Sequence, residues 1–176
     1  MKLLYVLVFL ILSQSAQTFA ASNTAQVQGM VREVFDGDSM LVVTRSKGTM
    51  KVRLYGIDAP ETEKPDRPGQ EYGDQARRVL KYKILGKEVL LDVQDKDQYS
   101  RSVAVVRIGR RDINAEMVAE GMAWAYRRYL EGPYASEYIQ LEEKARRRRL
   151  GLWRQANPKP PWEFRHGGEQ RGKKRR

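Results

Sequence analysis

The chain of 176 residues contains no cysteine and only one histidine, His166. Without cysteine it has no disulfide framework, no thiolate metal site and no cysteine nucleophile. His166 lies in a tail rich in Gly, Lys and Arg, so mechanisms that need a histidine base or a histidine pair are hard to build. Any bound metal ion would need oxygen ligands, which favours Ca²⁺, Mg²⁺ or Mn²⁺.

Long hydrophobic runs are also scarce, and the clearest one is residues 3–12. Lys2 precedes it and the small-residue site Thr18-Phe19-Ala20 follows it, which is typical of a secretory signal peptide. The run is too short to cross a bilayer, which needs about 20 apolar residues. We therefore expect residues 1–20 to be a signal peptide, the protein to be exported to the periplasm or beyond the cell, and no stable membrane insertion after cleavage. The alternative is an uncleaved membrane anchor.

Acidic residues are in the minority, with 22 Asp and Glu against 33 Lys and Arg and a net charge of +11. Basic side chains concentrate at residues 146–149 and 171–176. This pattern favours a polyanionic partner such as DNA or RNA. A solvated basic face, or attraction to anionic membrane surfaces, is the alternative. We expect a monomer, with residues 21–155 forming one domain and residues 156–176 a basic, disordered tail.

Apolar periodicity predicts five strands and three helices. Three strands are expected within residues 26–55, and two more at residues 89–93 and 102–108. Helical spacing appears in residues 72–84, after Asp112 and in residues 136–149. This order predicts an α+β fold, a five-stranded OB-fold barrel flanked by three helices. Such barrels often bind oligonucleotides, but a fold does not determine chemistry.

Carboxylates gather at one end of the hairpin expected for residues 39–55. If the chain turns at residues 47–48, the numbers of facing residues sum to about 95 or 96, which would place Asp38 nearly opposite Asp58. Two carboxylates so close need a proton or a cation between them. Asp36 and Glu61 are near in sequence, so the pattern predicts a calcium site. Taken singly, Asp36-Gly37-Asp38 is typical of a tight turn and residues 58–61 of a solvated loop.

Arg53 and Arg101 stand in or beside expected strands, apart from the charge runs. A guanidinium group suits bidentate phosphate binding and stabilises charge that develops during phosphoryl transfer. On a straight strand, however, Arg53 would lie about 16 Å from Asp58, at roughly 3.3 Å per residue. Only strong coiling of the barrel would join them. Both arginines could instead be edge-strand charges that discourage aggregation.

Three blocks of sequence occur in a characteristic order: Asp36-Gly37-Asp38-Ser39, then VRLYGIDAPE at residues 52–61, then DQYSR at residues 97–101. Together they resemble the thermonuclease, or staphylococcal nuclease, family, and the resemblance spans residues 27–153. It implies an OB-fold barrel and Ca²⁺-dependent hydrolysis of phosphodiester bonds in DNA and/or RNA.

The resemblance also implies roles for individual residues. Asp38, Asp58 and the carbonyl oxygen of Ala59 would bind Ca²⁺, and Glu61 would be the general base that activates the attacking water. Arg53 and Arg101 would contact the phosphate as catalytic residues. Substrate contacts are implied for three tyrosines, and either of the last two could stack on a base: Tyr99, Tyr126 and Tyr129. The alternatives are a non-catalytic OB-fold module that binds nucleic acid and an exported cationic protein acting at anionic envelope surfaces.

Overall fold

The computed structural model describes residues 25–46 and 48–165. The signal peptide predicted for residues 1–20 therefore lies outside the described residues, as do Lys47 and residues 166–176 of the predicted tail. Within the described ranges, no helix is long and apolar enough to cross a membrane.

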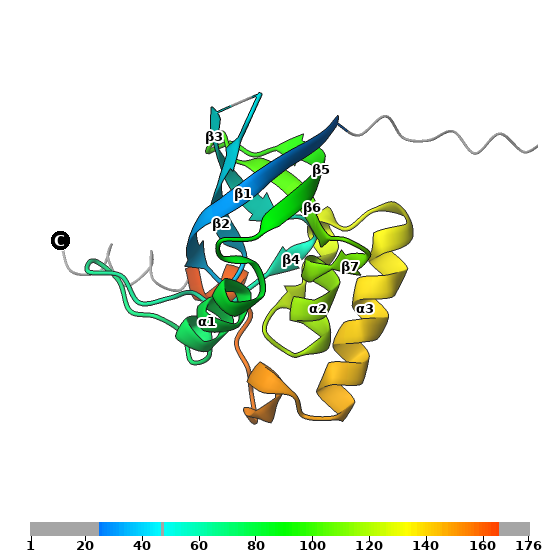
Figure 1. Ribbon diagram of the computed structural model, residues 1–176. Coiled ribbons are helices and arrows are strands. Elements are labelled where there is room, and N and C mark those ends of the chain that lie inside the picture. Colours follow the sequence, from blue (N-terminus) through cyan, green and yellow to red (C-terminus); the bar gives the residue numbers. More distant parts are fainter. Residues whose placement is uncertain (1–24, 47, 166–176) are drawn as a thin grey trace, which may run out of the picture.

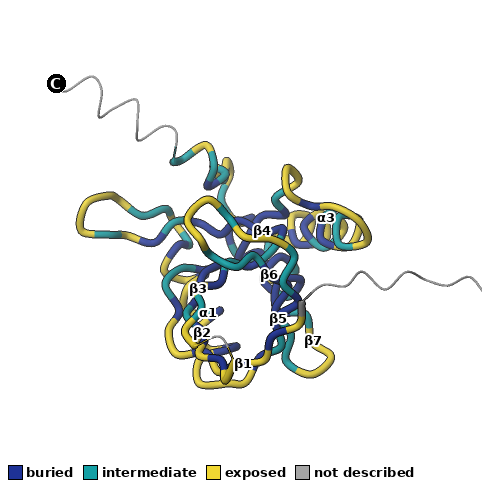
Figure 2. The backbone as a smooth tube through the Cα atoms, turned by 90° about the horizontal axis from the view of Figure 1, so that it is seen from above, coloured by how far each residue is buried: buried dark blue, intermediate teal, exposed yellow. Residues whose placement is uncertain are grey.

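Five strands form a closed barrel: β1 (Ala25–Asp36), β2 (Ser39–Thr44), β3 (Gly48–Leu54), β5 (Glu88–Lys96) and β6 (Ser102–Ile108). Antiparallel neighbours follow the order β3-β2-β1-β5-β6, and a parallel pairing of β3 with β6 closes the ring. Figure 2 looks along the barrel and shows these strands around its circumference. The predicted OB-fold barrel is confirmed.

Helices flank the barrel (Figure 1): α1 (Gly73–Ile84), α2 (Ile113–Ala119) and α3 (Gly132–Arg147). The three predicted helices are thus confirmed, and residues 161–165 add a short helical turn. Shorter elements complete the fold: the β7 strand (Arg111–Asp112), the paired strands β4 (Ile57–Asp58) and β8 (Trp124–Ala125), and the 3-10 turns η1 (Arg127–Tyr129) and η2 (Gly151–Arg154).

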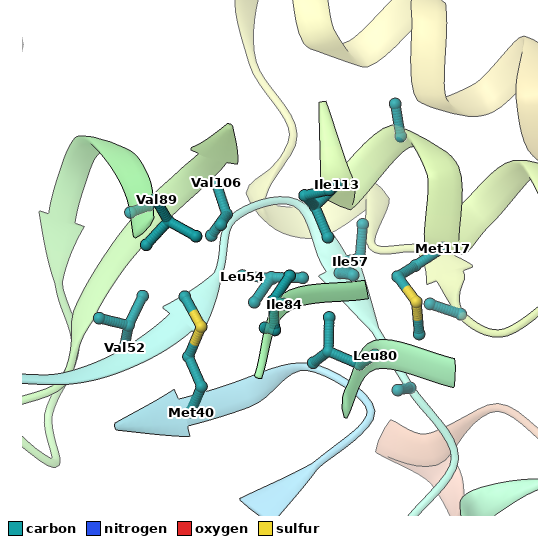
Figure 3. Close-up of a cluster of buried hydrophobic side chains, with 14 of the residues drawn as sticks. Met40, Val52, Leu54, Ile57, Leu80, Ile84, Val89, Val106, Ile113 and Met117 are labelled. Carbon is teal, nitrogen blue, oxygen red and sulfur yellow. The ribbon is translucent and has the colours of Figure 1, made fainter. Parts of the chain in front are cut away.

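The core lies inside the barrel and continues beneath α1 and α2 (Figure 3). In β3, Val52 and Leu54 are buried, whereas the alternate residues Lys51 and Arg53 are more exposed. This period of two follows from the pleat of a strand, which turns alternate side chains to opposite faces. The apolar residues thus fix β3 in the core and direct Arg53 to the outer face.

The register of β2 and β3 differs from the predicted one. Ser39 pairs with Arg53 and Thr44 pairs with Gly48, so facing residue numbers sum to 92. Asp38 therefore lies beside Leu54, whose N–H donates to the Asp38 carbonyl at 2.8 Å. The prediction that Asp38 faces Asp58 across this hairpin is wrong, because the strands pair up to Gly48 and the turn lies earlier than residues 47–48.

Asp58 reaches the barrel end through a turn at Gly56. Gly56 adopts a φ of 69°, a conformation that favours glycine, and a Cβ there would overlap the side chain of Leu130. After this turn, β4 leaves the direction of β3 and pairs with β8, with Asp58 opposite Trp124. The chain reversal brings Asp58 back toward Arg53.

A buried asparagine secures the start of this turn. Asn114 of α2 donates from Nδ2 to the carbonyls of Tyr55 (3.0 Å) and Ala104 (3.1 Å), and its Oδ1 accepts from Val106 N–H at 3.0 Å. Tyr55 is the residue immediately before Gly56. The end of β3 is therefore held against β6 and α2 where the chain departs toward Asp58.

Candidate active site

Arg53 bridges the two aspartates at the barrel end. Its Nη1 lies 3.1 Å from Asp38 Oδ2, and its Nη2 donates to Asp58 Oδ1 at 2.7 Å. Asp38 and Asp58 are only 4% and 0% exposed. The separation of about 16 Å expected for a straight strand does not occur, because the Gly56 turn folds Asp58 back onto β3. The carboxylates thus meet through a shared guanidinium group.

Burial shapes the protonation of Asp38. Desolvation raises the pKa of the Asp38 carboxyl above its ordinary value, and neighbouring Asp58 adds to this effect. Arg53 and a hydrogen bond donated by Ala59 N–H to Oδ2 (3.0 Å) oppose the rise without cancelling it. The pKa of Arg53 is raised in spite of burial, which lowers it, because both aspartates stabilise its charge. The barrel end therefore favours cations.

Glu61 follows in the loop before α1, and Gln70 fixes its backbone. Gln70 Oε1 accepts from Glu61 N–H at 3.1 Å, and Gln70 N–H donates to the Glu61 carbonyl at 2.8 Å. A side chain at Gly73 would collide with that same carbonyl, so glycine permits the close approach. The Glu61 side chain remains 14% exposed and accepts from Arg165 Nη1 at 2.7 Å. Its backbone is fixed while its carboxylate faces the aspartates.

The residue that sequence reasoning missed is Arg165. It joins Asp58 and Glu61, donating from Nη2 to Asp58 Oδ2 at 2.8 Å and from Nη1 to Asp58 Oδ1 at 3.2 Å. A tail was predicted to begin at residue 156, but residues 156–165 are structured and return to the barrel end (Figure 1, orange to red). For these residues the prediction of disorder is wrong. The proline and basic residues of this segment are typical of a tail, so its short helical turn was not predicted. Trp162 and Arg165 are three residues apart in this turn and share one face.

Asp36 belongs to a neighbouring cluster. Its carboxylate accepts from Thr62 Oγ1 and pairs with Lys64 Nζ at 3.3 Å. Among residues 25–46 and 48–165, no three Asp, Glu or His side chains converge in a geometry able to hold a metal ion. The predicted convergence of four carboxylates is therefore not observed. A turn at Gly37-Asp38 is observed, and it separates Asp36 from Asp38.

The remaining donor set still suits a hard cation. Asp38 and Asp58 supply two buried carboxylates, and Ala59, which follows Asp58 directly, adds a main-chain carbonyl. Ca²⁺ binds six to eight oxygen ligands and readily completes its shell with water. The same two carboxylates raise the pKa of Arg53, because they stabilise its positive charge. Two carboxylates and a carbonyl therefore fit such an ion.

Arg101 and Tyr99 lie in the turn between β5 and β6. Arg101 Nε pairs with Asp97 Oδ2 at 2.7 Å, and its guanidinium lies 5.5 Å from the ring of Tyr99. Asp97 Oδ1 also accepts from the N–H groups of both Tyr99 and Arg101. Among the described contacts, neither residue touches Asp38, Asp58 or Glu61. Arg101 and Tyr99 thus form a separate basic and aromatic pair near β3, without a described contact to the carboxylates.

Aromatic rings flank the other side of Asp58. Tyr126 N–H donates to the Gly56 carbonyl at 2.8 Å, which anchors Tyr126 beside the turn. One face of its ring stacks on Trp162, with centroids 5.1 Å apart, and its edge meets Tyr129 at 4.9 Å. Tyr129 is exposed. Of the three tyrosines, Tyr126 is the one anchored at the Gly56 turn that leads to Asp58.

Comparisons with known proteins show what the chain is similar to. A family model described as Staphylococcal nuclease homologue matches residues 51–155. The chain is 37% identical to a protein named Micrococcal nuclease from Shigella flexneri, covering 82% of this chain and 84% of that protein. It is 36% identical to an uncharacterized endonuclease of Haemophilus influenzae, covering 91% and 81%. It is also 35% identical to a protein named ParB from Escherichia coli, covering 86% of each.

Proposed function

This chain belongs to the staphylococcal nuclease family and is a nuclease, and from that premise we propose that it is an exported, calcium-dependent phosphodiesterase. The substrate is DNA, RNA or both, and the protein acts as a monomer. The observation that carries the chemistry is Arg53, which joins two buried aspartates at the barrel end where Glu61 is also held. Buried carboxylates that are paired with arginines are a frequent feature of functional sites.

Asp38, Asp58 and the carbonyl of Ala59 would hold the ion. When bound, Ca²⁺ supplies a Lewis acid that polarises the phosphoryl oxygens. Burial of the two aspartates excludes bulk water from one side of the site, which strengthens their attraction for a cation. The hydrogen bond that Ala59 N–H donates to Asp38 fixes the orientation of that carboxylate.

Glu61 is the proposed general base. Its partly exposed carboxylate takes a proton from a water molecule whose oxygen forms a bond to phosphorus. The phosphodiester P–O bond then breaks, and its electron pair remains on the departing oxygen, which gains a proton from solvent. Gln70 and Gly73 fix the loop, so that Glu61 remains within reach of the water without a large change in the backbone.

Arg53 and Arg101 are the proposed phosphate-binding residues. Arg53 already lies at the carboxylates, and its planar guanidinium group can turn one edge toward phosphate oxygens. Arg101 would approach the substrate from the neighbouring turn, with Tyr99 beside it. Tyr126 and Tyr129 would contact bases on the other side, because aromatic faces stack on every base.

The decisive assay uses the mature protein with single-stranded DNA and, separately, with RNA. Cleavage is measured with Ca²⁺, Mg²⁺, Mn²⁺ or a chelator. We expect cleavage with Ca²⁺, none with chelator, and a loss of roughly 10²–10⁴-fold in kcat for Glu61→Gln, as for removal of a general base. Glu63→Gln is the matched control, because Glu63 is an exposed carboxylate two residues away.

Two outcomes would contradict the proposal. Binding of nucleic acid without cleavage under every divalent ion would favour the non-catalytic OB-fold module. Equal turnover of Glu61→Gln and wild type would remove Glu61 from the mechanism. Export is tested separately, by sequencing the amino terminus of protein recovered outside the cytoplasm. A start near Ala21 is expected, and a start at Met1 would argue for an uncleaved anchor.

A further inference from the structure

Arg165 is the sole described side chain that contacts both Asp58 and Glu61. Its contact with Glu61 Oε1 is 2.7 Å, and its two contacts with Asp58 are 2.8 and 3.2 Å. One planar fork therefore sets the separation of the two carboxylates. Arg165 lies beyond residues 51–155, the part of the chain that the nuclease family model covers.

The segment that carries Arg165 is attached to the domain at several independent points. Gln70 Nε2 donates to the Lys159 carbonyl at 3.0 Å, and Pro161 is buried. Trp162 stacks on Tyr126 and meets the ring of Trp124 edge-on, with centroids 5.6 Å apart. It thereby joins the second hydrophobic cluster of the protein. Because Trp162 packs against this cluster, the segment is not a lid that opens readily. Arg165, three residues later, is therefore a permanent part of the site.

Gln70 connects this segment to the Glu61 loop. The same side chain that donates to the Lys159 carbonyl also accepts from Glu61 N–H through its Oε1. Glu61 is thus coupled to the C-terminal segment twice, through its backbone by Gln70 and through its carboxylate by Arg165. Such a double link is what a preorganised base requires.

Charge gives the physical reason for a second arginine. Arg53 contacts Asp38 and Asp58, but no described contact joins it to Glu61. Without another cation, Glu61 would be repelled by the aspartates and would turn toward solvent. Arg165 offsets this repulsion, because its guanidinium group donates hydrogen bonds to both carboxylates at once.

We propose that Arg165 is a positioning residue of the nuclease site, which holds the Glu61 carboxylate beside Asp58. The inference rests on the proposed role of Glu61 as general base. Arg165 acts through Glu61 and Asp58, and it does not itself take a proton from water. The C-terminal segment 156–165 is accordingly part of the catalytic domain.

The test compares Arg165→Ala and Arg165→Lys with wild type on single-stranded DNA at saturating Ca²⁺. For Arg165→Ala we expect kcat to fall roughly 10²-fold, the loss typical of a misplaced catalytic group, with KM nearly unchanged. Arg165→Lys should recover part of kcat, because it restores the charge without the bidentate fork. Arg154→Ala is the control: it removes an equal charge from an exposed position of η2 and should leave kcat unchanged.

A double-mutant cycle separates positioning from a purely structural role. In a Glu61→Gln background, Arg165→Ala should cost little further activity, since the residue through which it acts is already disabled. Wild type, the two single variants and the double variant are also unfolded thermally in chelator. We expect a non-zero interaction free energy between positions 61 and 165. This second readout does not depend on catalysis. Arg165→Gln serves in place of Arg165→Ala if the latter does not fold.

Several results would overturn the inference. An unchanged kcat in folded Arg165→Ala, or additive losses in the cycle, would show that Arg165 does not act through Glu61. Tighter Ca²⁺ binding by calorimetry, combined with faster cleavage, would show that Arg165 competes with the ion for Asp58. Inactivity of the wild-type protein with every cation would instead defeat the proposed function, and the coupling measured by unfolding would still test the contact itself.

Discussion

Asp38 is almost fully buried beside Arg53 and Ala59, and burial raises the pKa of its carboxyl above the ordinary value of 3.8. A group with a raised pKa in the folded state binds a proton that the unfolded chain has already released. Stability is therefore lost as pH rises from about 3.8 through the folded pKa. Ionised Asp38 is therefore maintained at a cost to the fold, which is common for side chains that serve a binding site.

Replacing this carboxyl tests that cost. In chelator at neutral pH, Asp38→Asn should raise Tm by roughly 2–4 °C, equivalent to about 1 kcal/mol in a domain of this size. The gain should shrink as pH falls through the raised pKa of Asp38, because the wild-type carboxyl then takes up its proton. Calcium binding, measured by calorimetry, should weaken strongly in the same variant.

Asp66→Asn is the matched control, since the side chain of Asp66 is largely exposed and the substitution removes the same charge. It should change neither Tm nor calcium affinity appreciably. A lower Tm for Asp38→Asn at neutral pH would mean that the pairing with Arg53 outweighs the cost of burial.

At the scale of elements, the site depends on how β3 ends. β3 ends at Leu54, the chain reverses at Gly56, and β4 then pairs with β8. Asn114 satisfies three backbone groups from three positions around this point, namely Tyr55, Ala104 and Val106. The side chain is completely buried, so water cannot replace these bonds.

Asn114→Ala should therefore be strongly destabilising. Removing its amide takes the partner of Val106 N–H and of the Tyr55 carbonyl, which costs about 1–3 kcal/mol for each group left unpaired. The Ala104 carbonyl still accepts from Tyr55 N–H. We expect a loss of about 3 kcal/mol in the free energy of unfolding, measured by urea denaturation. Asn157→Ala, at an exposed position, should be neutral. A loss below about 0.5 kcal/mol, the range of ordinary surface changes, would show that the turn is held by other contacts.

At the scale of the whole molecule, the net charge of +11 provides attraction for any polyanion. Five basic residues lie after Arg165 in the sequence: Arg171, Lys173, Lys174, Arg175 and Arg176. Their expected contribution is to affinity and to its dependence on salt, since phosphate neutralisation releases counterions regardless of sequence. Arg165, by contrast, is committed to the acidic site.

Two truncations separate these contributions. A chain that stops after Arg165 should retain kcat but bind single-stranded DNA with a shallower salt dependence, by up to about 0.7 in the logarithmic slope for each lost phosphate contact. A chain that stops after Gln155 also lacks Trp162 and Arg165, so its kcat should fall. Equal kcat in both would place the catalytic domain boundary near residue 155, as the sequence predicted.

Much of the fold was accessible from the sequence because its signals are local. Alternating Val52 and Leu54 identified β3, and the glycine after residue 84 identified the end of α1. The order of five strands and three helices was enough to predict the barrel. The ordered blocks around Asp38, Asp58 and Arg101 were enough to predict the family.

The geometry of the site was less accessible because it depends on register and chain reversal. An error of about four in the sum of paired residue numbers placed Asp38 opposite Asp58, and the straight-strand estimate kept Arg53 away from both. Neither turn position nor strand coiling is encoded in one residue. Arg165 was hidden for a different reason, because a Pro-rich basic segment has the composition of a tail and only its partners order it.

The sequence by itself determined which chemical groups are available, namely oxygen ligands without cysteine and arginines in strands. Its alternating apolar residues also determined which face of each barrel strand points into the core. The tertiary structure decided which of those groups meet. Arg53 reaches Asp58 because Gly56 reverses the chain, and Arg165 reaches Glu61 because Trp162 finds an aromatic surface more than thirty residues away in sequence. Local propensities act over a few residues, whereas these contacts form only once the core has brought distant segments together.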